Sequence, residues 1–152
     1  MSRTATINPR IIEGLYSEAL ILSDEVRATF MLSGRMGNAG RAEDLTRVAL
    51  SCEALRTTTR MMHAIAWLLN QRAYFMGEIS EFQLRRHGRL APDVAADTDR
   101  LALLDADIRD LIGASERFYA RLMRLDIGWR ERDADAPSAL AQLRERMRVV
   151  NR

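Results

Sequence analysis

The fold is decided by residues 45–76, LTRVALSCEALRTTTRMMHAIAWLLNQRAYFM. An apolar or small residue recurs here at alternating spacings of three and four, which keeps one face of an α-helix apolar. Thr59 is the only polar member of the series, which consists of Leu45, Val48, Cys52, Leu55, Thr59, Met62, Ala66, Leu69, Ala73 and Met76. At 1.5 Å per residue the series implies a rod of about 48 Å. Rods of this length predict a helical bundle and favour protein binding over catalysis.

Two further helices are predicted beside this rod. The first begins at Pro9, behind the N-cap Asn8, and ends near Ser33. Its apolar face is Ile12, Leu15, Ala19, Leu22, Val26 and Phe30. The other rod ends near Gly128, and its face is Leu101, Leu104, Ile108, Leu111, Ser115, Phe118, Leu122 and Leu125. Glycines at 34, 37 and 40 predict a loop before the central helix, which we place from Ala42 to Met76 with Gly77 as its C-cap.

Shorter elements follow the central helix. Ser80 and Gln83 fit a capping box, which predicts a connector helix from Glu81 to His87. The acidic stretch 93–99 is typical of a helix N-terminus. Ser138 is expected to cap a last amphipathic helix, on which Leu140, Leu143, Met147 and Val150 share one face.

These elements predict an all-α fold. We expect an antiparallel three-helix bundle with a long central helix, a short connector helix and a C-terminal helical appendage. Residues 1–128 would form the bundle domain, and 129–152 a linker and amphipathic helix.

The amino-acid composition limits the classes of partner that we expect for the protein. The chain has 152 residues, a net charge of +2 and 23 basic residues, all of them arginine. Absence of lysine is more typical of codon bias than of a nucleic-acid site. No apolar run is long enough to span a bilayer, and residues 1–10 lack the apolar core of a secretory signal. We therefore expect a cytoplasmic protein without a membrane or nucleic-acid partner.

The central helix carries more apolar surface than one bundle needs. Residues 61–69 are apolar around nearly the full circumference. The spare face would contain Trp67 and Tyr74, with Leu68 and Phe75 beside them. Either the connector from Phe82 to Leu90 or a second copy of the chain could cover this face, and we favour the homodimer.

Polar residues beside this face form a candidate partner or dimer interface. The cluster is Arg56, Arg60, Trp67, Gln71 and Arg72. Arg56 and Arg60 lie one turn apart, so their like charges need acidic partners. Those acids could come from another chain, or from Asp105 or Asp110 of the third helix.

Residues that carry catalysis are scarce. His63 lies beside apolar positions and is best read as a core or interface histidine, and His87 suits a helix C-terminus. The single cysteine, Cys52, is predicted to be a buried structural thiol. The sequence has no phosphate loop, nucleophile elbow or metal-ligand spacing. We expect no enzyme activity, cofactor, metal or small-molecule substrate.

The central helix resembles a known family. EALRTTTRMM at 53–62, AWLLNQRA at 66–73 and Gly77-Glu78 are similar to the RcdA family, the regulators of CtrA degradation in alphaproteobacteria. Relatives are often described only as a domain of unknown function. The resemblance implies an all-helical, non-catalytic homodimer that acts in the cell cycle. Such adaptors help deliver regulatory proteins to the AAA+ protease ClpXP, together with a response-regulator partner and a further adaptor. Arg56, Arg60, Trp67, Gln71 and Arg72 match the family's motif.

Three functions therefore stand as hypotheses. The first is a dimeric adaptor for regulated proteolysis, with the C-terminal helix bearing Arg144, Arg146 and Arg148 as its recruiting element. The second is a DNA-associated helical protein that uses the same arginines together with Arg152. The third, a helical-bundle mutase that holds a dicarboxylate with buried arginines, lacks the paired carboxylate or base it would need.

Overall fold

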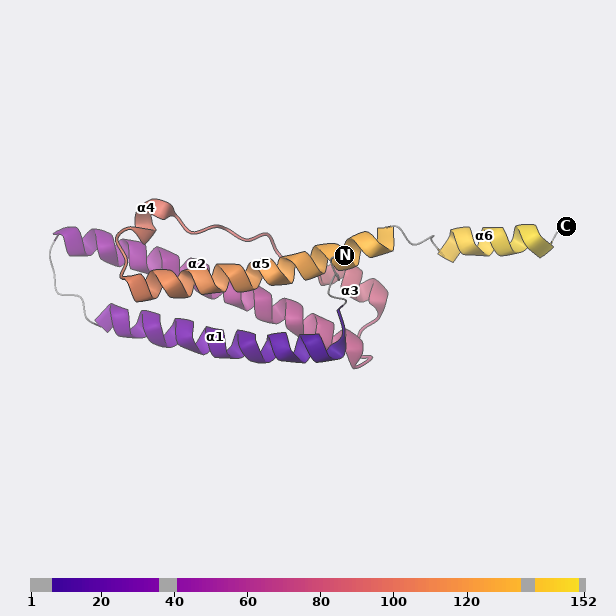
Figure 1. Ribbon diagram of the computed structural model, residues 1–152, viewed down its shortest axis with the longest axis horizontal. Helices are drawn as coiled ribbons and strands as arrows, with labels where there is room; N and C mark the ends of the chain where they lie inside the picture. Colours follow the sequence, from indigo (N-terminus) through magenta and orange to yellow (C-terminus); the bar gives the residue numbers. More distant parts are fainter. Residues whose placement is uncertain (1–6, 36–40, 135–138, 151–152) are drawn as a thin grey trace, which may run out of the picture.

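The computed structural model describes residues 7–35, 41–134 and 139–150, and it is helical throughout most of them (Figure 1). The helices in chain order are α1 (Pro9–Arg35), α2 (Arg41–Phe75), α3 (Glu81–His87), α4 (Thr98–Leu101), α5 (Ala106–Ala134) and α6 (Ala139–Val150). The predicted all-α fold, with its long central helix, short connector and C-terminal appendage, is confirmed. Both predicted bounds of α2 are within one residue of the observed ones.

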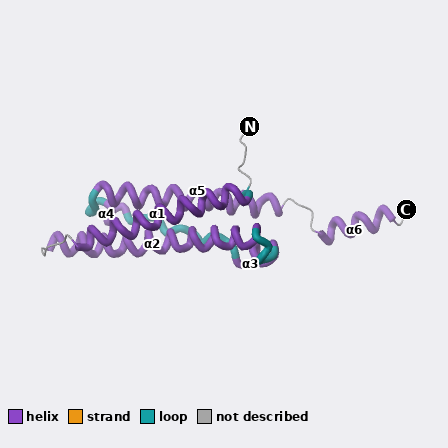
Figure 2. Tube along the Cα trace, turned by 90° about the horizontal axis from the view of Figure 1, so that it is seen from below, coloured by secondary structure: helices purple, strands orange, loops and turns teal. Residues whose placement is uncertain are grey.

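The three long helices α1, α2 and α5 form the bundle, and α6 extends beyond its end (Figures 1 and 2). α1 runs antiparallel to α2. α5 instead runs parallel to α2, as two contacts show. Arg60 contacts Ser115 and, further along both helices, Trp67 contacts Asp126. The bundle is therefore only partly antiparallel.

This parallel pair depends on a non-helical segment, residues 88–97, which we call the strap. After α3, at the C-terminal end of α2, the strap carries the chain back along the bundle to α4 and the start of α5 (Figure 1). A parallel neighbour needs such a crossover, whereas an antiparallel neighbour needs only a tight turn. The acidic stretch 93–99, predicted to suit a helix N-terminus, ends in one: Asp97 is the N-cap of the short helix α4 and Asp99 lies in its first turn. The long helix α5 begins only at Ala106, and Asp93 lies in the strap.

The core lies where α1, α2 and α5 meet. The predicted faces of α1 and α5 are correct, since Ile12, Ala19 and Val26 of α1 and Ile108, Phe118 and Leu122 of α5 are buried. From α2, the residues Met61, Ala64, Trp67 and Leu68 complete the main cluster. A smaller cluster joins Ala49 to Leu104, Ile108 and Ile112.

Local chemistry sets the helix ends near α3. Ser80 and Gln83 form the predicted capping box, with Gln83 N donating to Ser80 Oγ and Ser80 N to Gln83 Oε1. Gly77 adopts φ +77° directly after α2, a backbone conformation that glycine reaches without strain. Gly88 closes α3, and a Cβ there would lie 2.5 Å from the carbonyl oxygen of Leu84.

The predicted end of the third rod at Gly128 is wrong, because α5 continues to Ala134. The extra turns are held by α3: Arg130 Nη1 donates to the carbonyl oxygen of Arg85, and the Arg85 guanidinium lies 4.9 Å from the Trp129 ring centroid. One glycine in a helix interior costs only about 1 kcal/mol, less than such contacts can return. The predicted cap Ser138 and the loop glycines 37 and 40 lie outside the described residues.

The apolar series of α2 faces away from the core. Its large members are 44–70% exposed: Leu45, Val48, Leu55, Met62, Leu69 and Met76. α2 instead turns toward the bundle the face that contains Ala49, Glu53, Thr57, Arg60, Ala64, Trp67 and Gln71. The rod was predicted correctly, but the face that it buries is the other one.

Candidate functional site

Polar side chains line the buried face of α2. Glu53, Thr57, Arg60 and Gln71 are each at most 2% exposed, and all four sit on the side that meets α5 and the strap. Buried polar groups need hydrogen-bond partners, so this row defines what must lie against it. Two members of the row, Glu53 and Arg60, bind the strap.

Arg60 makes the densest set of contacts. Its Nε donates to both carboxylate oxygens of Asp93, at 2.8 and 3.0 Å, and its Nη2 donates to the carbonyl oxygen of Val94 at 3.0 Å. Its Nη1 donates to Ser115 Oγ of α5, also at 3.0 Å. A single buried guanidinium thus joins α2, α5 and the strap.

Four more side chains bind the strap through its backbone. Arg56 Nη1 donates to the carbonyl oxygen of Ala95 at 2.9 Å, and Asp97 N donates to Glu53 Oε1 at 3.4 Å. From α5, the Tyr119 hydroxyl donates to the carbonyl oxygen of Ala91. Leu90 N donates to Asp126 Oδ2 at 3.3 Å. The strap is therefore pinned along its whole length, from both helices.

Arg56 and Arg60 were predicted to pair either with a partner or with Asp105 or Asp110. The observed acidic partner lies within the chain, but it is Asp93 of the strap rather than an acid near the start of α5, and α5 contributes the Ser115 hydroxyl to Arg60. Asp105 and Asp110 are exposed near the start of α5. The like charges one turn apart are accommodated because each guanidinium meets strap oxygen atoms.

Tyr119 is buried beside this network. Burial raises the pKa of its hydroxyl from 10 to about 12, and the neighbouring Asp93 carboxylate adds to the increase. The neutral hydroxyl is the form that donates to the strap. Tyr119 therefore holds the strap over the whole physiological pH range.

Some polar atoms on the buried faces are left over. Glu53 Oε2, Thr57 Oγ1, Gln71 Nε2 and Arg130 Nη2 find no hydrogen-bond partner among the described residues. Glu53 and Thr57 lie one turn apart on α2, beside the end of the strap. The strap therefore does not use all the hydrogen-bonding capacity that lies along it.

Trp67, Leu68 and Gln71 are not on the outer face where they were predicted. All three are at most 2% exposed, and Trp67 Nε1 donates to Asp126 Oδ1 at 3.1 Å. Side chains without exposed surface cannot contact a partner unless the bundle opens. The prediction failed because α1 and α5 pack against the face of α2 that contains Trp67. The face with the regular apolar series from Leu45 to Met76 is the exposed one among the described residues.

The other predicted interface residues are partly buried. Arg72 Nε donates to Glu13 of α1 at 2.6 Å, and its guanidinium lies 4.5 Å from the Tyr16 ring centroid. Tyr74 packs on Phe75 with ring centroids 5.3 Å apart. Arg72 thus holds α1 against α2, an intramolecular role.

The exposed face of α2 is the second candidate site, and we call its ten-residue series, Leu45 to Met76, the seam. The spacing is a strict seven-residue repeat, the pattern of a coiled-coil interface. No described helix covers it. Arg72, on one side of the seam, contacts α1, and Arg56, on the other, contacts the strap. His63, predicted to be a core or interface histidine, is exposed, and Cys52, predicted to be buried, is half-buried on the seam.

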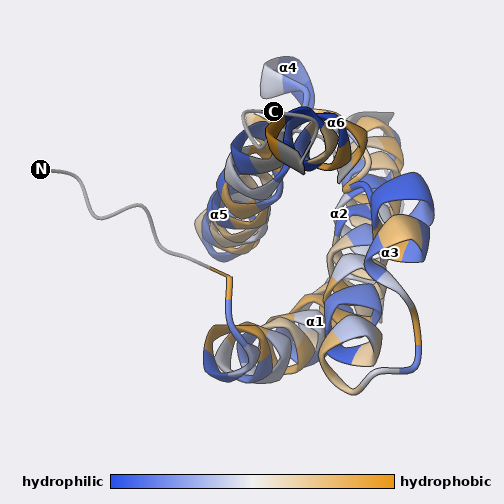
Figure 3. Cartoon of the chain, turned by 90° about the vertical axis from the view of Figure 1, so that its right-hand side faces the viewer, coloured by the Kyte–Doolittle hydropathy of each residue, from blue (hydrophilic) through white to orange (hydrophobic). Residues whose placement is uncertain are grey.

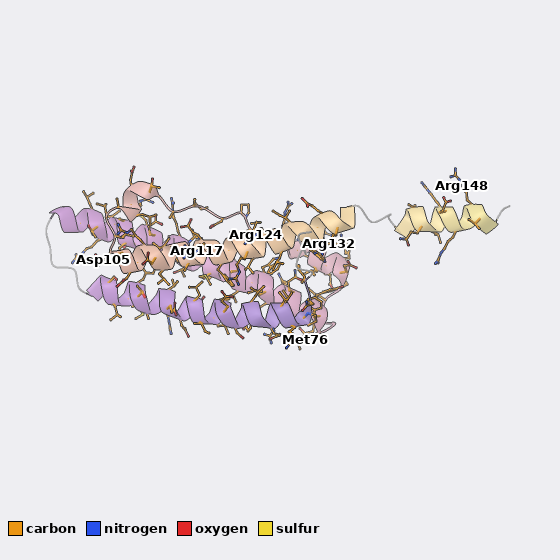
Figure 4. All side chains as sticks on the ribbon, viewed as in Figure 1. Met76, Asp105, Arg117, Arg124, Arg132 and Arg148 are labelled. Carbon is orange, nitrogen blue, oxygen red and sulfur yellow. The ribbon has the colours of Figure 1, made fainter. Side chains whose placement is uncertain are left out.

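α6 presents a third exposed surface. Leu140, Leu143, Met147 and Val149 are 59–71% exposed, and Arg144, Arg146 and Arg148 are exposed with them (Figure 4). Both hydrophobic and hydrophilic residues colour α6 (Figure 3), and the helix lies beyond the end of the bundle (Figure 1). An isolated helix of 12 residues is marginal in water, so a partner surface would stabilise α6.

Sequence reasoning missed Glu53, Tyr119 and Asp126 as binding residues. The signal that could have found Asp126 is a carboxylate next to an apolar helix face. Asp126 directly follows Leu125, the last member of the apolar series of α5. Glu53 gave no such signal, because the face that contains it was taken as solvent-exposed.

Comparison with known proteins identifies the family. The sequence profile of one family, described as a protein of unknown function (DUF1465), matches residues 3–151. The chain belongs to this family. No curated protein and no solved structure matches the chain.

In the part of the chain that the structure describes, no helix is long and apolar enough to cross a membrane. Within the same ranges, His, Cys, Asp and Glu side chains form no group of three that could hold a metal ion.

Proposed function

We propose that the protein is a non-catalytic dimeric adaptor that pairs with a second copy along the seam of α2. The observation that carries this proposal is the seam itself, an uncharged heptad series of ten residues on the side of α2 opposite the core. Exposed apolar surface of this length marks a protein interface. Its regular repeat favours another helix as the partner surface.

The side-chain sizes favour an antiparallel partner. In a parallel pair each residue meets its own copy, so Ala66 would face Ala66 and leave a void. An antiparallel pair with its two-fold axis midway along the seam places large residues against small ones in most layers. The five layers are Leu45–Met76, Val48–Ala73, Cys52–Leu69, Leu55–Ala66 and Thr59–Met62.

The adaptor role follows the resemblance to the RcdA family. We propose that the dimer recruits cell-cycle regulatory proteins to a ClpXP-type AAA+ protease in the cytoplasm, with a response-regulator adaptor as a further partner. α6 is the proposed recruiting element, because its apolar face and its arginines 144, 146 and 148 are exposed and lie outside the bundle. A helix with apolar residues at these spacings suits a groove on a partner protein.

A reconstituted degradation assay tests the recruiting role. Purified ClpXP degrades a response-regulator-controlled substrate with and without this chain, and with a chain that ends at residue 138. The proposal expects faster degradation only with the full chain. Equal rates with the full and the shortened chain would remove α6 from the account.

Exposed arginines on α6 also keep DNA association as the second candidate. Contacts to phosphate release counterions, so DNA binding would weaken steeply between 50 and 200 mM salt. Replacing Arg144, Arg146 and Arg148 with glutamine would abolish it. Titration of a fluorescent duplex at both salt concentrations distinguishes this candidate from the adaptor, which needs no DNA.

A further inference from the structure

The strap has the features of a bound peptide rather than of an ordinary loop. Between residues 88 and 97 it forms no helix, and five side chains of α2 and α5 bind its backbone. Two of its side chains are bound by α2 and α5 as well: Leu90 is 3% exposed, and Asp93 pairs with Arg60. At the end of the strap, Ala96 packs against the smaller core cluster and the Asp97 carboxylate caps α4. Peptide-binding grooves work in this way, with backbone hydrogen bonds for affinity and a few side-chain pockets for specificity.

Three of the other strap side chains are exposed. Val94 is 62% exposed, and Pro92 and Ala95 are exposed as well. Along residues 90–95, recognition therefore centres on one buried apolar residue and one acidic residue three positions later, in a segment that forms no helix. The groove favours that spacing because the Leu90 side chain belongs to the main buried cluster, while Asp93 pairs with Arg60.

The groove also has unused capacity. Glu53 Oε2 and Thr57 Oγ1 near one end of the strap, and Arg130 Nη2 near the other, find no partner among the described residues. An occupant that satisfied these atoms would gain hydrogen bonds that the strap does not make. The strap thus binds the groove without using all of its hydrogen-bonding atoms, so another segment could bind more tightly.

We propose that the groove between α2 and α5 is a docking site for an extended acidic segment of a partner protein, and that the strap occupies it in cis as an autoinhibitory ligand. The partner segment has an apolar residue followed, three positions later, by Asp or Glu. Docking displaces the strap and places the segment against Arg60 and Arg56. The proposal does not require the dimer or the protease partner.

A synthetic peptide tests this directly. The probe is a fluorescein-labelled peptide with the sequence of residues 88–98, GRLAPDVAADT, and binding to the full chain is followed by anisotropy. In the wild type the tethered strap competes at millimolar effective concentration, so binding is weak. The variant Leu90→Ala/Asp93→Asn weakens the strap without changing the groove. We expect the peptide to bind this variant at least tenfold more tightly than the wild type.

Two controls test whether the peptide binds in the groove. The variant Val94→Thr changes an exposed strap residue and should bind the peptide as weakly as the wild type. A peptide that carries the same alanine and asparagine changes should not bind the double variant. If the helical circular dichroism of the double variant is lost, Asp93→Asn alone takes its place.

Each other outcome overturns the proposal. A folded double variant that fails to bind the peptide shows that the groove does not accept a segment in trans. Equal binding of the wild-type and the altered peptide shows that the Leu90 and Asp93 positions select nothing. Loss of the fold in both variants shows that the strap is an obligatory part of the core.

Discussion

Replacing Arg60 with alanine should weaken the bundle more than any other single change at the strap. The side chain is 1% exposed and makes four hydrogen bonds, to both Asp93 oxygens, the Val94 carbonyl and Ser115. Its removal leaves a buried void and frees one end of the strap from both helices.

The size of this loss of stability depends on whether Asp93 and Ser115 find other hydrogen-bond partners once Arg60 is removed. Breaking a buried ion pair by removing one member costs about 3–5 kcal/mol. Asp93 is 28% exposed and regains water, and Ser115 keeps its bond to the Ile112 carbonyl, so the lower limit applies. We expect the free energy of unfolding to fall by about 3 kcal/mol, which lowers the midpoint of thermal unfolding by about 6–12 °C.

Urea unfolding followed by helical circular dichroism measures this change. Arg56→Ala is the matched control, because Arg56 is more exposed than Arg60 and donates one hydrogen bond to the same strap, at the Ala95 carbonyl oxygen. This substitution should cost no more than about 1 kcal/mol. Adding Asp93→Ala to each variant completes a double-mutant cycle, with coupling expected for Arg60 only. If Arg60→Ala costs no more than Arg56→Ala, the strap is not held as described.

Four further changes have defined outcomes. Trp67→Phe removes the indole donor to Asp126 and should lower the free energy of unfolding by about 2 kcal/mol in urea melts, whereas an unchanged midpoint would contradict the buried hydrogen bond. The pKa of Tyr119 is 10 in the unfolded chain and about 12 in the folded protein. The contribution of its neutral hydroxyl to the free energy of unfolding is therefore complete below pH 10 and is lost as the pH rises through 12. The loss is about 3 kcal/mol, and it should be absent in Tyr119→Phe. Gly77→Ala should destabilise by about 1 kcal/mol because φ is +77°, while Gly14→Ala, inside α1 with open space around it, should stabilise by a similar amount in thermal melts.

Helix positions were predictable because each signal was local. The capping box at Ser80 and the apolar repeats of α1 and α5 depend on residues within one or two turns. The end of α5 was not predictable, since Trp129 and Arg130 are held by α3, more than forty residues earlier.

The face of α2 that meets the bundle could not be chosen from its sequence alone. The seam is the more regular apolar series, whereas the buried face contains Glu53, Thr57, Arg60 and Gln71. Glu53 and Arg60 are compatible with a core because the strap, and for Arg60 also Ser115, supplies hydrogen-bond partners for them. A segment without secondary structure leaves no periodic signal, so neither the strap nor its contacts could be expected.

The central claim is that α2 pairs with a second copy along the seam, and the mass of the protein in solution tests it most directly. Light scattering after size exclusion at micromolar concentration should give twice the mass of one 17.3 kDa chain for the wild type. Leu55→Glu, which places a charge on the seam, should give one chain mass. Ile21→Glu, an equally exposed apolar position between α1 and α5, should remain dimeric. A wild-type mass of one chain, or a Leu55→Glu variant that stays dimeric, would contradict the account.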